Sequence, residues 1–98
     1  MEATVETELD RVDTRKGEWS VRAHNNPVTA FADVIGVFII SCGYDQEKAF
    51  LYTMMIHASG SAVCYWSNKE RCEEVVNDFR KIGVEAEVIE ANSGGSHG

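Results

Sequence analysis

Apolar and polar residues alternate strictly over residues 19–24, the period of a strand that buries one face. The following Asn25-Asn26-Pro27 ends this strand, because asparagine favours turns and proline has no N–H for a ladder. Residues 30–42 are almost continuously apolar, which predicts a helix that is apolar on nearly every side and therefore largely buried. We expect Thr29 to cap the start of this helix and Gly43 to end it.

The second half of the chain repeats these signals. Asp45 can cap a second helix over residues 45–58, which Gly60 stops. Residues 62–66 form a short apolar run that predicts a buried strand. The sequence Ser67-Asn68-Lys69-Glu70 has the pattern of a capping box, and the helical spacing behind it continues to Gly83. Residues 84–88 alternate again, which predicts a third strand.

The predicted order is therefore strand, helix, helix, strand, helix, strand. A single small sheet with helices packed on one face buries all the apolar stripes, so we expect an α+β fold in two layers. The length of 98 residues suits one domain, which we place at residues 18–92. Residues 1–17 are predicted to be a flexible N-terminal arm and residues 93–98, SGGSHG, a flexible tail.

Charge and cysteine content exclude several classes of function. The net charge of -7 and the absence of a basic stripe argue against a nucleic-acid partner. The longest apolar run, residues 34–42, is too short to span a bilayer, and the acidic N-terminus lacks signal-peptide features. Three cysteines without CxxC spacing indicate buried thiols in a reducing compartment. We therefore expect a cytoplasmic protein, by default a monomer, with no membrane partner, metal or cofactor.

Two places could carry chemistry. The Asn25-Asn26-Pro27 turn joins a strand to a helix and could hold binding groups on a rigid scaffold, although the pattern alone favours a plain turn. His57 shares a helical face with Thr53 and Ile56, a pattern that core packing and helix-end placement also explain. Cys64 and His57 could form a thiol and base, but no orienting group or nucleophile motif accompanies them. We predict no catalytic residues and no enzyme.

Four segments carry a resemblance to a known family. They are HNNPVTAF at residues 24–31, Tyr44-Asp45 with the EKA that starts the second helix, TMMIH at 53–57 and GSAVC at 60–64. In this register the chain from about residue 19 to residue 90 resembles ClpS, the adaptor of bacterial ATP-dependent Clp proteases. The resemblance implies a ClpS-like β-α-α-β-α-β fold with a three-stranded antiparallel sheet and three helices.

The resemblance also implies a function. ClpS proteins bind N-degrons, which are substrates that begin with Phe, Tyr, Trp or Leu, and deliver them to a ClpA- or ClpC-type AAA+ unfoldase. By position, Asn25, Asn26 and His57 would hold the substrate's α-amino group. The N-terminal arm would engage the unfoldase, and Glu70 matches a position that touches it. The pocket for the first side chain maps to Ala23, His24, Thr29, Phe31, Val34, Thr53, Ile56 and Val84.

This sequence departs from the family pattern at the site. Asn26 and Pro27 replace two acids, and Phe31 and Thr53 replace two methionines. A hydrogen bond to a charged partner contributes about 1.5–3 kcal/mol against about 1 for a neutral one, so we expect about tenfold weaker amine capture. One alternative is a divergent ClpS-like protein that binds the unfoldase and modulates the protease without N-degron recognition. Another is a ribosomal-stalk-type domain, whose partners would be translation factors.

Overall fold

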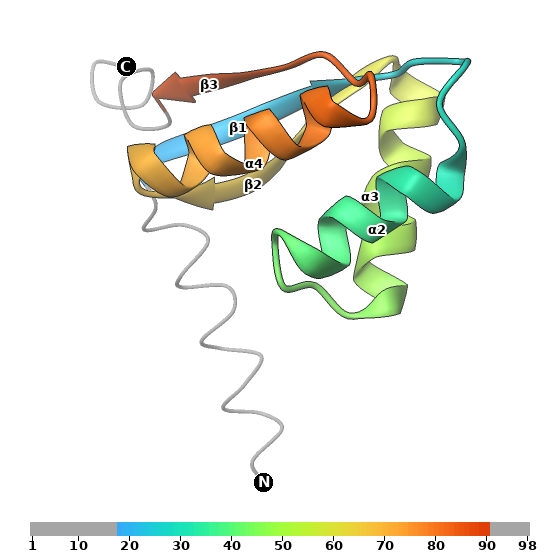
Figure 1. Cartoon of the computed structure of the whole chain (residues 1–98), viewed down its shortest axis with the longest axis horizontal. Helices are drawn as coiled ribbons and strands as arrows, with labels where there is room; N and C mark the ends of the chain where they lie inside the picture. The colour runs from blue at the N-terminus through green and yellow to red at the C-terminus, as the bar shows by residue number, and fades with distance from the viewer. Residues whose placement is uncertain (1–17, 91–98) are drawn as a thin grey trace, which may run out of the picture.

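The computed structural model describes residues 18–90, which fold in the predicted element order (Figure 1). The predicted arm at 1–17 and tail at 93–98 lie outside these residues. No helix in the described range is long and apolar enough to cross a membrane. The elements are β1 (Trp19–His24), α2 (Phe31–Ile40), α3 (Gln46–Ser59), β2 (Ser61–Ser67), α4 (Lys69–Lys81) and β3 (Ala86–Glu90).

The three strands form one antiparallel sheet in the order β2-β1-β3. Ala23 of the central strand pairs with Ala62 on one side and Ala86 on the other, which sets the register of both neighbours. α4 covers one face of this sheet, while α2 and α3 cross each other beyond the end of α4 (Figure 1). This arrangement confirms the predicted α+β fold with a three-stranded antiparallel sheet and three helices.

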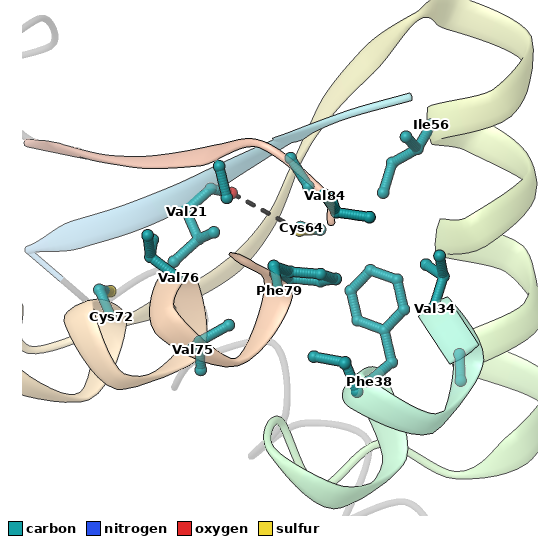
Figure 2. Packing of buried hydrophobic residues seen from close by; sticks show 14 residues of the cluster. Val21, Val34, Phe38, Ile56, Cys64, Cys72, Val75, Val76, Phe79 and Val84 are labelled. Carbon is teal, nitrogen blue, oxygen red and sulfur yellow. Dashed lines mark hydrogen bonds between the residues drawn. The ribbon is translucent and has the colours of Figure 1, made fainter. Parts of the chain in front are cut away.

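The core lies where α2, α3 and α4 meet the sheet. Phe38 of α2 is fully buried, and its ring packs edge-on against the ring of Phe79 with the centroids 5.3 Å apart. The Phe38 ring also contacts the rings of Tyr44 and Tyr52, whose centroids lie 5.7 Å and 5.8 Å away. Figure 2 shows Phe38 facing Phe79, so α2 is joined to the sheet-bound α4 through this aromatic pair.

The first helix differs from its prediction in cap, length and burial. α2 begins at Phe31 behind Ala30, whose side chain forms no capping hydrogen bond, so the prediction of Thr29 as the cap was wrong. α2 also ends at Ile40 rather than at residue 42, and Ile40 is 84% exposed. The prediction that much of this helix is buried was also wrong, because only one face of α2, with Val34, Val37 and Phe38, reaches the core.

Of the caps predicted for the other two helices, one is confirmed and one is wrong. The Asp45 carboxylate accepts a hydrogen bond from the backbone N–H of Lys48 at 2.8 Å, which confirms the cap of α3. The cap of α4 is Asn68 and not Ser67, so the predicted capping box was one residue out of register. Ser67 is the last residue of β2 and cannot leave the ladder to cap the helix.

The second strand is less buried than its apolar run predicted. Within β2 only Cys64 is buried, and its six neighbours are half-buried. The prediction of a buried strand was wrong because β2 lies at an edge of the sheet, where every residue of the strand except Cys64 is partly exposed to solvent.

Candidate functional site

The predicted turn after β1 is anchored at both flanks by backbone hydrogen bonds. The N–H of His24 donates to the carbonyl of Glu85 at 2.9 Å, and the N–H of Asn25 donates to the carbonyl of Gly60 at 2.8 Å. The turn is therefore tied to the α4–β3 connection on one side and to the end of α3 on the other. This attachment gives the turn the rigid support that a binding loop needs.

Two side chains near the turn add hydrogen bonds to the α4–β3 connection. The Asn26 Nδ2 donates to the carbonyl of Gly83 at 2.6 Å, while its Oδ1 accepts from the N–H of Val28 at 2.8 Å. The Thr29 Oγ1 donates to the carbonyl of Ile82 at 3.0 Å, which is why Thr29 does not cap α2. Gly83, whose carbonyl binds the Asn26 side chain, has a left-handed backbone conformation with φ of 88°. Asn26 and Thr29 thus join residues far apart in sequence into one rim.

A small hollow opens between this rim and the two crossing helices. Its volume is about 20 Å³, which holds roughly one water molecule, whereas a cavity that binds benzene measures about 150 Å³. Phe31, one of its lining residues, is 40% exposed, and a large side chain can enter the hollow only if the lining moves. The lining consists of eight residues, Asn25, Asn26, Thr29, Phe31, Val34, Thr53, Ile56 and Val84.

The floor of the hollow belongs to the hydrophobic core. Val34 of α2, Ile56 of α3 and Val84 before β3 are all buried members of the core cluster. Figure 2 shows their side chains at the end of the core beside α3. Because the core supports these three side chains, the floor is rigid and apolar, as a pocket for a hydrophobic side chain requires.

The polar groups of the lining are mostly committed to the protein itself. The Thr53 hydroxyl donates to the carbonyl of Ala49 at 2.8 Å, and Asn26 and Thr29 bind the α4–β3 connection. Within residues 18–90 the side-chain amide of Asn25 makes no hydrogen bond, so it is the polar group available to a ligand. No lining residue is ionisable.

Three residues predicted for the site do not line the hollow. His57 is exposed on α3, where its ring meets the Phe31 ring edge-on with the centroids 5.1 Å apart. Ala23 is fully buried within the sheet. The ring of His24 lies 2.8 Å from the Glu87 carboxylate, on the face of β1 opposite Ala23. His57 therefore borders the site through Phe31, whereas His24 belongs to the sheet surface.

The remaining candidate groups are placed apart from the hollow. Cys64 is fully buried, its thiol donates to the carbonyl of Val21 at 3.6 Å (Figure 2), and burial raises its pKa. Burial also raises the pKa of the Cys42 thiol to about 12 and raises that of Cys72. The thiols stay protonated at neutral pH, which makes them poor nucleophiles. Glu70 is exposed in the first turn of α4 and does not line the hollow.

The Asn26 contact predicts a stability effect. We expect Asn26→Asp to lower the free energy of unfolding at pH 7 by about 1–3 kcal/mol, because the carboxylate cannot donate to the Gly83 carbonyl and would face it at hydrogen-bond distance. Urea unfolding followed by circular dichroism measures the change. Asn25→Asp is the matched control and should stay within about 0.5 kcal/mol of the wild type. Equal stability of the two variants would show that the Asn26 amide does not hold the rim.

The fold and the hollow together define a small α+β domain with a small, partly apolar hollow beside a strand–helix turn. The family model described as "ATP-dependent Clp protease adaptor protein ClpS" matches residues 14–87. This chain belongs to the ClpS family, as the sequence predicted.

Individual proteins agree with this assignment. The chain is 32% identical over 66 residues to the ATP-dependent Clp protease adapter protein ClpS of Streptomyces coelicolor, covering 67% of this chain and 69% of that protein. It is also similar to the structure of Agrobacterium tumefaciens ClpS2 bound to L-phenylalaninamide, with a TM-score of 0.64 and 17% identity. That likeness covers 74% of this chain and 94% of the other, and it shows the shared fold.

Proposed function

We propose that this chain binds the N-terminal residue of substrate proteins that begin with Phe, Tyr, Trp or Leu and delivers them to a Clp AAA+ unfoldase of the ClpA or ClpC type. The observation that carries the proposal is an apolar hollow with a rigid floor and an uncommitted amide, Asn25, in its wall. ClpS2 of Agrobacterium tumefaciens, which has the same fold, binds L-phenylalaninamide, the amide of an amino acid with a free α-amine and a bulky apolar side chain.

Different residues at the hollow bind the first side chain and the α-ammonium group of the ligand. The first side chain enters the hollow as Phe31 turns aside, and it contacts Val34 and Ile56 on the floor. The oxygen of the Asn25 side-chain amide accepts a hydrogen bond from the α-ammonium group of the ligand. The His57 ring contacts the Phe31 ring edge-on, and in this proposal it approaches the amine as the Phe31 ring moves. Together these contacts select a free N-terminus with an apolar first residue.

Delivery requires a second surface. In this proposal residues 1–17 engage the unfoldase and Glu70 contacts it from the exposed start of α4. Glu70 does not line the hollow. Substrate and unfoldase can therefore be bound at the same time, as an adaptor requires.

Two features favour a second candidate, a ClpS-like protein that binds the unfoldase and modulates the protease without reading N-degrons. The lining contains no carboxylate for the ammonium group, and the hollow holds roughly one water molecule until Phe31 moves. This candidate retains the unfoldase surface and gives no role to the hollow.

Peptides that differ only in their first residue separate the two candidates. We expect Phe- and Leu-initiated peptides to bind at least tenfold more tightly than a Gly-initiated one in fluorescence polarisation, because burying such a side chain contributes about 1.5–3 kcal/mol. His57→Ala should weaken binding of the Phe peptide about fivefold, the equivalent of one neutral hydrogen bond.

His24→Ala is the matched control for the histidine. Its ring is held by Glu87 away from the hollow, so peptide affinity should stay as in the wild type. If all first residues bind equally, or if His57→Ala and His24→Ala have the same effect, the N-degron proposal fails and the modulator becomes the better account.

A further inference from the structure

The exposed apolar side chains are concentrated in one part of the molecule. Among the described residues, every large hydrophobic side chain that is exposed lies between residues 28 and 55, in the first turn and the two crossing helices. They are Val28, Phe31, Ile39, Ile40, Phe50, Leu51 and Met55. By contrast, the exposed positions of α4 are charged or polar. A concentration of this kind marks an interaction surface.

Part of this surface continues directly from the hollow. Phe31, Ile35 and Ile39 are spaced by four residues on α2, so they form a stripe along one face. Phe31 lines the hollow, and Ile35, one turn farther on, lines a broad, shallow depression. The other side of this depression is made by three residues of α3, Gln46, Glu47 and Phe50.

The spacing along α2 fits an extended peptide. Four helical residues advance by about 6 Å, at 1.5 Å each. In an extended chain, side chains two residues apart point to the same face and are separated by about 6.6 Å. A ligand whose first side chain occupies the hollow beside Phe31 therefore places its third side chain beside Ile35 when it follows α2.

We propose that the Ile35–Phe50 depression binds the third residue of the N-degron ligand and selects a large apolar side chain there, with a basic residue preferred next to it. The inference rests on the proposed function and adds a second determinant of specificity. Phe50 is 49% exposed and, together with Ile35, supplies the apolar wall that a third side chain would cover. Glu47 forms no ion pair within residues 18–90 and provides the charge that a lysine or arginine would meet.

A second copy of this chain or a partner protein could also cover an apolar depression. The continuity through Phe31 favours the ligand itself, because the same helix face that borders the first side chain also borders the depression. A ligand anchored in the hollow reaches the depression without a further loss of translational freedom, which an independent partner would undergo.

The test uses two Phe-initiated peptides of sequence Phe-Ser-X-Lys followed by a common tail, where X is leucine or glycine. We expect the leucine peptide to bind about fivefold more tightly, as judged by fluorescence polarisation. Phe50→Ala should remove this difference. Leu51→Ala, which alters the next and similarly exposed residue of α3 outside the depression, should preserve it.

A charge swap tests the proposed preference for a basic residue next to the third residue. Replacing the lysine of the leucine peptide by glutamate should weaken binding, and Glu47→Lys should restore it at low salt. Glu73→Lys, on the exposed face of α4, is the matched control and should not restore it.

The outcomes keep the two proposals distinct. If both peptides require their first Phe but leucine and glycine bind equally, the third-residue inference is overturned and the proposed function stands. If Phe50→Ala weakens both peptides equally, Phe50 only supports the hollow, and the inference is again overturned. Self-association that is lost in Phe50→Ala, seen by sedimentation, would assign the depression to a second copy. If no Phe-initiated peptide binds, both proposals fail.

Discussion

Phe38→Ala is expected to lower the free energy of unfolding by about 3–5 kcal/mol, the largest stability effect that we predict for a single substitution. The side chain is fully buried, and its ring contacts the rings of Tyr44, Tyr52 and Phe79 at centroid distances of 5.3–5.8 Å. Alanine would remove this whole aromatic centre and leave a cavity where α2, α3 and α4 meet. Small domains have a total stability of about 5–15 kcal/mol, so the variant would be close to unfolding.

Urea unfolding monitored by tyrosine and tryptophan fluorescence measures this effect. Ile40→Ala is the matched control, because Ile40 is on the same helix but 84% exposed, and its loss should cost less than about 0.5 kcal/mol. Similar midpoints for both variants would show that Phe38 is not at the centre of the core.

Acetylation of the N-terminus of a Phe-initiated peptide is expected to reduce binding about tenfold to hundredfold. The charged amine donates to the Asn25 amide in the proposed complex, and a hydrogen bond to a charged group contributes about 1.5–3 kcal/mol. Acetylation removes that charge and adds an acyl group at the rim, where the Asn26 and Thr29 side chains are already fixed by Gly83 and Ile82. The rim therefore has little freedom to accommodate the added group.

The control is the same peptide with a free N-terminus and an acetylated lysine near its C-terminus, which changes the net charge equally. This peptide should bind as tightly as the unmodified one in isothermal titration. Equal affinity for the two acetylated peptides would rule out amine capture, and the hollow would then recognise only an apolar side chain.

Local patterns in the sequence predicted most of the fold. The order of elements followed from changes of hydrophobic period, and the Asp45 cap and the stop at Gly60 are local features that the structure confirms. The errors arose where tertiary contacts override a local signal. Thr29 has a good capping side chain, yet its hydroxyl binds Ile82, a residue 53 positions away. β2 has a buried-strand composition, yet the sheet places it at an edge.

The candidate site was predictable to a similar degree. The register of the family resemblance identified Asn25, Asn26 and six other residues that line one hollow, although their roles in binding stay predictions. The sequence could not show that His24 points away from the hollow. That depends on the face of β1 that carries its ring, and this face turns the ring toward Glu87. It also could not show that Asn26 binds Gly83, because the turn and the α4–β3 connection are adjacent only in the folded chain.

The rim formed by Asn26 and Thr29 has a consequence for the order of folding. Its hydrogen bonds close loops of more than fifty residues, which are the slowest kind of contact to form. The turn, α2 and α3 emerge first during synthesis, but the wall of the hollow is missing until α4 and β3 have been made and docked. A partly synthesised chain therefore has no complete hollow, and under the proposed function it could not retain a substrate before it is itself fully folded.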